Sequence, residues 1–544
     1  MAASARPNTA LRENRRDDLL VPISVSYLAL PCLLFAVTWL RPGFAVLSVL
    51  ILAGFAALLV RDVTAVRPSR GAAGYALDGR AHGMPPWRAV IPSLMLLVVW
   101  VLLSGTGGFG FQHRDYRASN AILYDLVTRP WPPTVVVNGV QEPLVYYVAY
   151  YLPAAGAGHV FGWEAANVLL WIWTVLGACL SLLWFFRASG FDLHARPVLL
   201  FCVALLFCLA GGLDLLGSTF LRNQLMTISS ENEWWAGYFQ YSSNTTLLFW
   251  VPQQAIPAWL ATGLILDAGR NGRAWTYAGL VLAALLIWSP IALLGILPFA
   301  VAGLGLGLGS SASVPWRARA FWAASLGALV LGGIQAAYVL SNRFSFPSGL
   351  LWRIVQDHGT YVRYLIAFWL LEFGIIAALV WAVLFRSTFA EVGKVAKRGP
   401  QSTRHDLERL QLDFGMDRAD LTFLLLAVAV LGVLPLFTVG IYNDLAMRGS
   451  IPALFVLWAS VARLLFRSTS QARRRNAGWL AGMALVMLLG IHPAIVNISE
   501  SIDRYHFGPP SVTTVQTTAT ANDPEIVAQR LGNRDSFFNL YLGR

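Results

Sequence analysis

Charged residues are scarce in this sequence, at 12% of its 544 residues. A soluble domain carries roughly 25% charged residues, so the composition excludes a water-exposed surface over a chain of this length. Hydrophobic residues make up 57%, in long runs separated by short charged clusters. Runs of about 20 apolar residues cross the roughly 30 Å hydrocarbon core of a bilayer. The composition therefore predicts an all-α polytopic integral membrane protein.

Cysteine is also sparse, and no cleavable signal peptide is evident. The four cysteines lie inside apolar runs, where they act as small hydrophobic residues rather than disulfide partners or metal ligands. The first 20 residues are polar, and the apolar run that starts at Val21 has no convincing small-residue cleavage site. The net charge is +12. The basic loop 386–420 also carries acids and has no aromatic interleaving, so nucleic acid is not an expected partner.

Thirteen transmembrane helices are predicted, each near the length that a bilayer requires. The break at Ser289-Pro290 separates two of them that could form one helix by length alone. The predicted spans are 23–40, 44–61, 88–106, 163–186, 196–217, 245–267, 274–289, 290–309, 319–340, 364–386, 420–440, 450–466 and 477–497.

The orientation follows from the arginines. With the N-terminus in the cytoplasm, every short cytoplasmic loop is basic, as the positive-inside rule requires, and the C-terminus is extracytoplasmic. We expect a cytoplasmic N-terminus with two additional spans (1–87), a transmembrane module (88–497) and a short exterior C-terminal segment (498–544). The expected location is the bacterial inner (plasma) membrane.

The exterior loops are then 107–162, 218–244, 341–363 and 441–449. Within the first loop, residues 141–161 are apolar, but a crossing there would invert Arg187 and every later basic loop. We therefore predict an interfacial helix at 141–161, with its tyrosines in the lipid headgroup layer. A second amphipathic helix is predicted at about 118–127.

The span predicted at 245–267 contains Pro252 and Pro257 around the amides of Gln253 and Gln254. Two prolines and two amides inside a span indicate a kinked or broken helix that lines a cavity.

Three motifs in the first exterior loop resemble a known family. Asp115 follows a span directly, residues 142–147 read EPLVYY, and residues 162–164 read GWE before the next span. This order is similar to the GT-C superfamily of integral membrane glycosyltransferases, such as protein O-mannosyltransferases and lipid A aminoarabinose transferases. The resemblance covers about 105–190 closely. It departs at Asp115, which is a single acid where many relatives have two, and at Glu142, which replaces a histidine.

The resemblance implies a GT-C-like fold and an inverting glycosyltransferase. The enzyme would move a hexosyl or pentosyl group from a polyprenyl-phosphate donor to a hydroxyl of a glycan, lipid or protein acceptor. It implies no certain cofactor and leaves a divalent metal open. The remaining partner is the lipid bilayer itself.

The chemistry of this transfer selects the candidate residues. A carboxylate must take the acceptor proton, and Asp115 is the predicted catalytic base. Positive groups must hold the departing phosphate, which the forked guanidinium of arginine suits. The predicted substrate-binding residues are His113, Arg114, Arg117, Asn120, Glu142, Tyr146, Arg343, Asn443, Asp444 and Arg448.

Each assignment has a plainer alternative. Asp115 could cap a helix or pair with Arg114 or Arg117. Glu142 could cap the tyrosine helix, and His113 could be structural. Asp444 and Arg448 are four residues apart and could simply pair with each other on one helical turn.

Two other functions compete with the transferase. A transporter or flippase for a lipid-linked saccharide would place ionisable residues in mid-span, where acids are scarce here. An O-antigen ligase or polymerase-like enzyme would carry a large late exterior loop rich in arginine and histidine, whereas the dense loop in this chain comes early.

Overall fold

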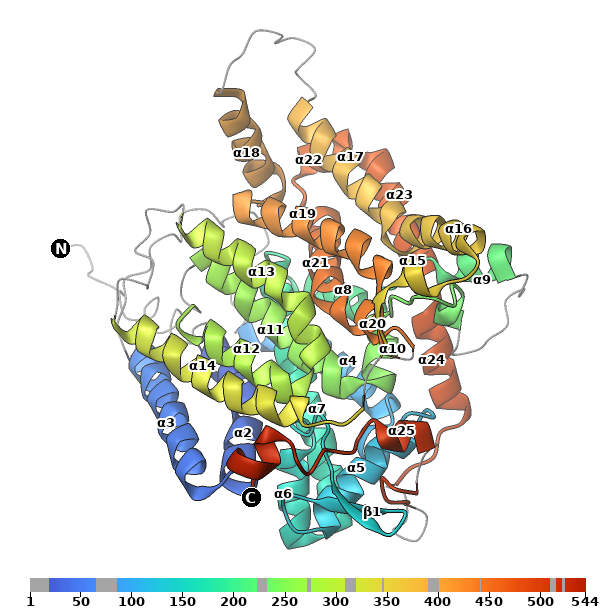
Figure 1. Cartoon of the computed structure of the whole chain (residues 1–544). Helices are drawn as coiled ribbons and strands as arrows, with labels where there is room; N and C mark the ends of the chain where they lie inside the picture. The colour runs from blue at the N-terminus through green and yellow to red at the C-terminus, as the bar shows by residue number, and fades with distance from the viewer. Residues whose placement is uncertain are drawn as a thin grey trace, which may run out of the picture.

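The computed structural model describes residues 19–64, 86–222, 232–271, 275–308, 319–344, 347–389, 401–440, 442–508, 515–520 and 524–544. Helices dominate these residues, as the composition predicts (Figure 1). The first twelve are α2 (Leu20–Trp39), α3 (Pro42–Thr64), α4 (Pro86–Leu103), α5 (Tyr116–Thr128), α6 (Leu152–Phe161), α7 (Trp163–Ala188), α8 (Pro197–Leu209), α9 (Asp214–Arg222), α10 (Asn244–Trp250), α11 (Pro252–Asn271), α12 (Trp275–Trp288) and α13 (Pro290–Leu308).

The second half of the chain continues the pattern and ends in short elements. Its helices are α14 (Arg319–Leu340), α15 (Leu351–Ile354), α16 (His358–Phe368), α17 (Ile375–Phe389), α18 (Gln401–Phe414), α19 (Arg418–Val433), α20 (Asp444–Gly449), α21 (Ile451–Arg467), α22 (Ser470–Arg475), α23 (Ala477–Gly490), α24 (His492–Asp503) and α25 (Pro524–Ala528). Strands β1 (Thr134–Val137) and β2 (Val140–Pro143) pair antiparallel, as do β3 (Ser348–Leu350) and β4 (Phe437–Val439).

Nine helices of the described residues are long and apolar enough to cross a membrane. Three further predicted spans correspond to shorter apolar helices at 87–103, 275–288 and 290–306. The span predicted at 245–267 is divided between α10 and α11 at Val251. The structure therefore shows an all-α polytopic architecture without confirming a count of thirteen spans.

The divided span matches the predicted effect of its prolines. Pro252 begins α11 because proline has no backbone N–H to donate and suits the first turn of a helix. Likewise, Pro290 separates α12 from α13, so these are two helices.

The end of α13 lies against the start of α12. A methyl group placed on Gly303 would lie 3.0 Å from the Trp275 ring.

The first predicted span packs into the main body of the protein. The ring of Tyr27 in α2 stacks on Trp173 of α7 with centroids 3.9 Å apart, and its hydroxyl donates to the Trp173 carbonyl. The indole of Trp184 donates to Ser24 at 2.9 Å. Helix α2 is therefore part of the same core as α7.

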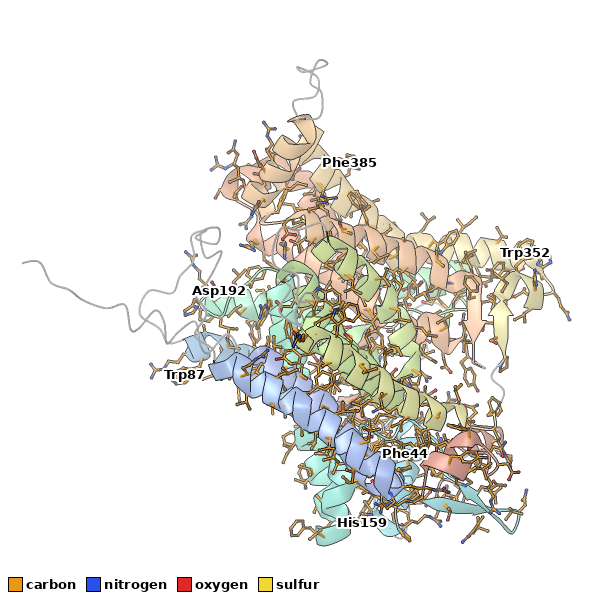
Figure 2. The ribbon with its side chains drawn as sticks, turned by 60° about the vertical axis from the view of Figure 1, so that its left-hand side comes forward. Phe44, Trp87, His159, Asp192, Trp352 and Phe385 are labelled. Carbon is orange, nitrogen blue, oxygen red and sulfur yellow. The ribbon has the colours of Figure 1, made fainter. Side chains whose placement is uncertain are left out.

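The bundle has two ends, which Figure 2 separates. Asp192 and Trp87 lie at the left of the view and Phe385 at the top, whereas Phe44 and His159 lie in the lower part and Trp352 at the right. We call the second group's side the Asp115 end and the first group's side the Asp192 end. Helix α21, whose residues 451–464 are all buried, runs between them.

The prediction of an interfacial tyrosine helix at 141–161 is wrong over most of its length. Residues 140–143 form β2, and helix begins only at Leu152. Tyr150 and Tyr151 are 2% and 1% exposed, and the Tyr150 hydroxyl lies 2.6 Å from that of Thr174. Tyr150 turns into the protein, where Thr174 satisfies its hydroxyl, and Tyr151 is buried beside it. An apolar run in the sequence cannot reveal such a pairing. The helix predicted at 118–127 is confirmed as α5.

The last residues lie across the Asp115 end. We call residues 524–544 the C-terminal strap. Its backbone pairs with three distant segments, at Leu40–Gly543, Leu144–Leu531 and Asn342–Gly532. The strap thereby ties the start of α3, the β1–β2 hairpin and the end of α14 together (Figure 1).

Candidate functional site

A glycine-rich turn positions Asp115 directly after α4. Gly105 has a φ of 78°, and a methyl group on it would lie 2.1 Å from the Phe111 carbonyl oxygen. Only glycine combines this left-handed backbone with so close an approach. The Gln112 amide donates to the Gly105 carbonyl at 2.9 Å and holds the turn closed. Asp115 follows this turn and is the residue immediately before α5.

The Asp115 side chain does not act as a helix cap. It occupies the N-cap position of α5, but its carboxylate accepts no capping hydrogen bond. The side chain is partly buried, and this burial raises the pKa of the carboxyl group. Arg448, Arg114 and Arg530 oppose the shift, in that order, and Asp444 adds to it. Asp115 therefore lies in a shared electrostatic environment with residues from three separate segments.

Asp444 and Arg448 form the ion pair that their spacing predicts. The Arg448 Nη1 lies 2.9 Å from an Asp444 carboxylate oxygen, and both side chains are 16% exposed. This pair leaves the guanidinium only partly used, because the buried Arg448 Nε has no hydrogen-bond partner among the described residues. The pair therefore does not exclude a ligand at Arg448.

Asn443 has a local role in holding this pair. Its backbone is left-handed, with a φ of 52°, and its side chain caps α20 by accepting from the Ala446 N–H. Its amide nitrogen also donates to the Tyr238 carbonyl at 3.1 Å. Asparagine tolerates this conformation better than most residues. The structure thus places Asn443 behind the centre, as a support of α20.

Arg530 of the C-terminal strap also lies near Asp115, and it is not among the residues predicted from the sequence. Its guanidinium lies 5.3 Å from the centroid of the Tyr146 ring, and the residue is 5% exposed. Its Nη1 has no hydrogen-bond partner among the described residues. The available signal was the predicted exterior position of the tail, where any arginine departs from the positive-inside rule.

Tyr146 and Tyr147 form the wall between these arginines. Their rings have centroids 4.6 Å apart, and the Tyr338 hydroxyl holds the Tyr146 backbone by donating to its carbonyl at 3.1 Å. Burial raises the pKa of Tyr147, while Arg448 lowers it. Tyr146 is one of the residues predicted to bind substrate, and Tyr147 is an addition to that set. We call Asp115, Tyr146, Tyr147, Asp444, Arg448 and Arg530 the Asp115 centre.

His113 and Asn120 point elsewhere. The His113 ring stacks on Trp250 with centroids 4.8 Å apart, and its Nδ1 lies 3.8 Å from Glu500. Burial lowers the pKa of His113 to about 4, so the structural alternative describes this residue better. The Asn120 amide donates to Gln112 at 2.8 Å and supports the glycine turn.

Glu142 and Arg343 pair with each other at 3.1 Å. Glu142 lies in β2, so the alternative that it caps a tyrosine helix is wrong. The Arg343 N–H donates to the Leu531 carbonyl at 3.0 Å, which makes the pair a fastening of the strap. Arg114 and Arg117 are exposed, and Arg114 alone of these four acts on Asp115.

A metal ligand set is not evident at this centre. Within the described residues, no group of three or more histidines, cysteines or acids is arranged to hold an ion. Asp115 and Asp444 are the carboxylates of the centre, and each has an arginine neighbour. Whether the protein uses a divalent metal therefore stays open, as it was from the sequence.

A second group of acids lies deeper in the protein. Glu372 occupies a π-helical turn at Trp369–Gly374, and the indole of Trp235 donates to it at 2.9 Å. Asp214 is brought beside it, because the Leu213 N–H donates to the Leu371 carbonyl. Glu233 accepts from the Ser243 N–H at 2.9 Å nearby. The sequence contains few acids within its apolar runs, and nothing in it indicates that these three lie together.

Two cavities among the described residues are lined by residues outside the Asp115 centre. A cavity of about 200 Å³ lies between the last residues of the C-terminal strap, 534–544, and residues 132–134 and 143–145. A cavity of about 1380 Å³ opens at the Asp192 end, beside Arg463 and Arg467 of α21.

Comparison with protein-family models, curated proteins and solved structures finds no match to this chain.

Proposed function

We propose that this chain is a membrane glycosyltransferase that works at its Asp115 end. It transfers a sugar from a polyprenyl-phosphate donor to a hydroxyl of a glycan, lipid or protein acceptor, with inversion at the anomeric carbon. The observation that carries the proposal is the position of Asp115. Its carboxylate is partly buried beside Arg448 and Arg530, which come from distant parts of the chain.

Asp115 supplies the base. The acceptor hydroxyl gives its proton to the Asp115 carboxylate as the oxygen attacks the anomeric carbon. The bond from that carbon to the phosphate oxygen breaks on the opposite face, so the polyprenyl phosphate leaves with the bonding electrons. Burial raises the pKa of Asp115, which makes it a stronger proton acceptor than an exposed aspartate.

Arg448 and Arg530 stabilise the leaving phosphate. Negative charge grows on the phosphate oxygens as the bond breaks, and fixed cations in a partly dry site lower the energy of that state. Both guanidiniums keep a buried N–H without a partner among the described residues. Arginine can offer phosphate two parallel hydrogen bonds, so these donors suit the headgroup of the donor lipid.

The exterior location of this end is part of the proposal. Arg187, Arg196 and Arg473 lie at the Asp192 end, around its cavity. The positive-inside rule assigns such a basic end to the cytoplasm. The Asp115 end then faces the extracytoplasmic side of a bacterial plasma membrane. Polyprenyl chains would lie in the bilayer, with their phosphate at the level of α20.

A lipid-linked saccharide transporter is the second candidate, and one observation favours it. Asp214, Glu233 and Glu372 are 0%, 2% and 2% exposed, and they lie together inside the helical body. Buried acids within membrane helices often serve proton-coupled transport, and π-helical turns such as that at Glu372 recur at functional sites. We rank it second because the arginine-flanked Asp115 suits chemistry on a phosphate ester.

Purified protein incubated with a panel of labelled polyprenyl-phosphate sugars tests the proposal. Asp115→Asn should lower transfer at least about 100-fold, the size of a lost general base. The matched control is Asp535→Asn, an exposed acid of the strap, which should transfer normally. Full transfer by Asp115→Asn would refute the role of Asp115. Movement of intact donor across proteoliposomes without a new glycosidic bond would support the transporter instead.

A further inference from the structure

The large cavity at the Asp192 end has a distinct character. It measures about 1380 Å³ and is enclosed by the ends of α7, α8, α11, α19, α21 and α22. Helix α21 begins beside Arg448 and ends at this cavity, about 25 Å away by the rise of its 17 residues. The cavity is therefore separate from the Asp115 centre.

Cations outnumber acids in the lining. Six arginines face four aspartates there. Asp420 accepts from both Arg270 and Arg463, and Asp267 pairs with Arg187 at 2.6 Å. The buried Arg270 Nε has no hydrogen-bond partner among the described residues. The cavity thus keeps positive charge beyond its internal ion pairs. The arginines are Arg187, Arg196, Arg270, Arg463, Arg467 and Arg473.

Two glycine turns make room for Arg467. A methyl group on Gly190 would lie 2.1 Å from the Arg467 Nη1, and one on Gly415 would lie 2.9 Å from the same atom. Both glycines have positive φ, at 79° and 68°, which disfavours a side chain there. Arg463 ties the same turns together by donating to the Gly415 and Ala188 carbonyls. Arginines that only orient the protein in the membrane need to be charged and exposed, not packed against backbone turns. The packing of Arg463 and Arg467 therefore indicates a formed binding site.

Apolar residues form the rest of the wall. Trp184, Leu199, Cys202 and Phe466 lie in the lining beside the arginines. A ligand that fits would carry a compact anion and tolerate an apolar neighbour. Arginine clusters favour phosphate because their planar forks match its oxygens. We propose that this cavity binds a phosphate group, carried by an anionic lipid headgroup or by a soluble phosphorylated molecule.

The test uses the full chain in nanodiscs and measures the midpoint of thermal unfolding. One arm compares phosphatidylcholine discs with and without phosphatidylglycerol. The other adds inorganic phosphate, or chloride at equal ionic strength, to phosphatidylcholine discs. The variant is Arg196→Gln with Arg473→Gln, two exposed arginines of the lining. The control is Arg418→Gln with Arg474→Gln, which removes equal charge from exposed positions outside the lining.

We expect wild type and the control to be stabilised in at least one arm. In the variant, the ligand concentration for half of the effect should rise about tenfold, the loss expected for two charge-assisted contacts. Stabilisation by phosphatidylglycerol alone identifies a lipid headgroup, and stabilisation by inorganic phosphate identifies a soluble source. The proposal fails if neither arm stabilises the protein, or if the variant and control respond alike.

Discussion

Burial shifts the pKa values of His113 and Asp115, two residues apart in the first exterior loop, in opposite directions. It raises the pKa of Asp115 and lowers that of His113 to about 4, because a dry environment disfavours whichever form is charged. The sequence predicted that both would lie near the membrane surface. It could not predict that Asp115 turns toward Arg448 while His113 turns toward Trp250, since these partners come from other segments.

His113 should make the stability of the protein depend on pH. The folded state holds the imidazole neutral down to about pH 4, whereas in the unfolded chain it gains a proton below about 6.5. The free energy of unfolding should therefore fall as pH drops from 6.5 toward 4 and level off below that. Between pH 7 and 5 the loss should be about 2 kcal/mol.

Thermal unfolding of detergent-solubilised protein at pH 7 and 5 measures this effect. His113→Phe keeps a ring against Trp250 and removes the titration, so its midpoint should vary less with pH than that of the wild type. Glu500 and Arg504, which also act on His113, are present in both proteins. An equal pH dependence in the two would contradict the prediction.

At the scale of elements, contact between helices depends on small residues that hydropathy does not reveal. Helices α7 and α11 pack closely because Gly263 faces Trp184, and a methyl group there would lie 2.5 Å from the Trp184 Cβ. Membrane helices lack a hydrophobic drive to associate, so close packing holds them together. The apolar runs predicted where helices occur, but their partners followed from such local shapes.

Gly263→Ala should destabilise the protein by about 1–3 kcal/mol, the usual cost of overpacking. The control is Gly333→Ala in α14, where an added methyl group meets nothing within 4 Å. That change should be neutral or stabilising by up to about 1 kcal/mol, because alanine favours a helix over glycine. Midpoints of thermal unfolding measure both. Equal shifts would show that close packing of α7 and α11 is not the cause.

At the scale of the molecule, the two ends carry different features. The Asp115 end gathers the first exterior loop, α20 and the C-terminal strap, and the Asp192 end carries the arginine-lined cavity. The strap was expected as a short exterior tail. Its pairing with Leu40, Leu144 and Asn342 was not predictable, because contacts between residues so far apart in the chain have no local pattern.

Cysteine labelling in cells should reveal the orientation. In a chain without its native cysteines, His159→Cys should react with a membrane-impermeant maleimide in intact cells, because this exposed residue lies at the Asp115 end (Figure 2). Asp192→Cys, also exposed, should react only after permeabilisation, as the positive-inside rule requires. Labelling of Asp192→Cys in intact cells would place the Asp115 centre in the cytoplasm and contradict the proposed reaction side.

The sequence by itself determined the membrane architecture, the helix breaks at Pro252 and Pro290, and Asp115, Asp444 and Arg448 as candidates. These features depend on contiguous residues, since a bilayer selects apolar length and a proline acts on its own turn. Only the tertiary structure decided that Arg530 joins Asp115, that Glu142 pairs with Arg343, and that arginines from four helices and a loop surround one cavity. Such neighbours depend on how distant segments pack, which local hydropathy and charge do not encode.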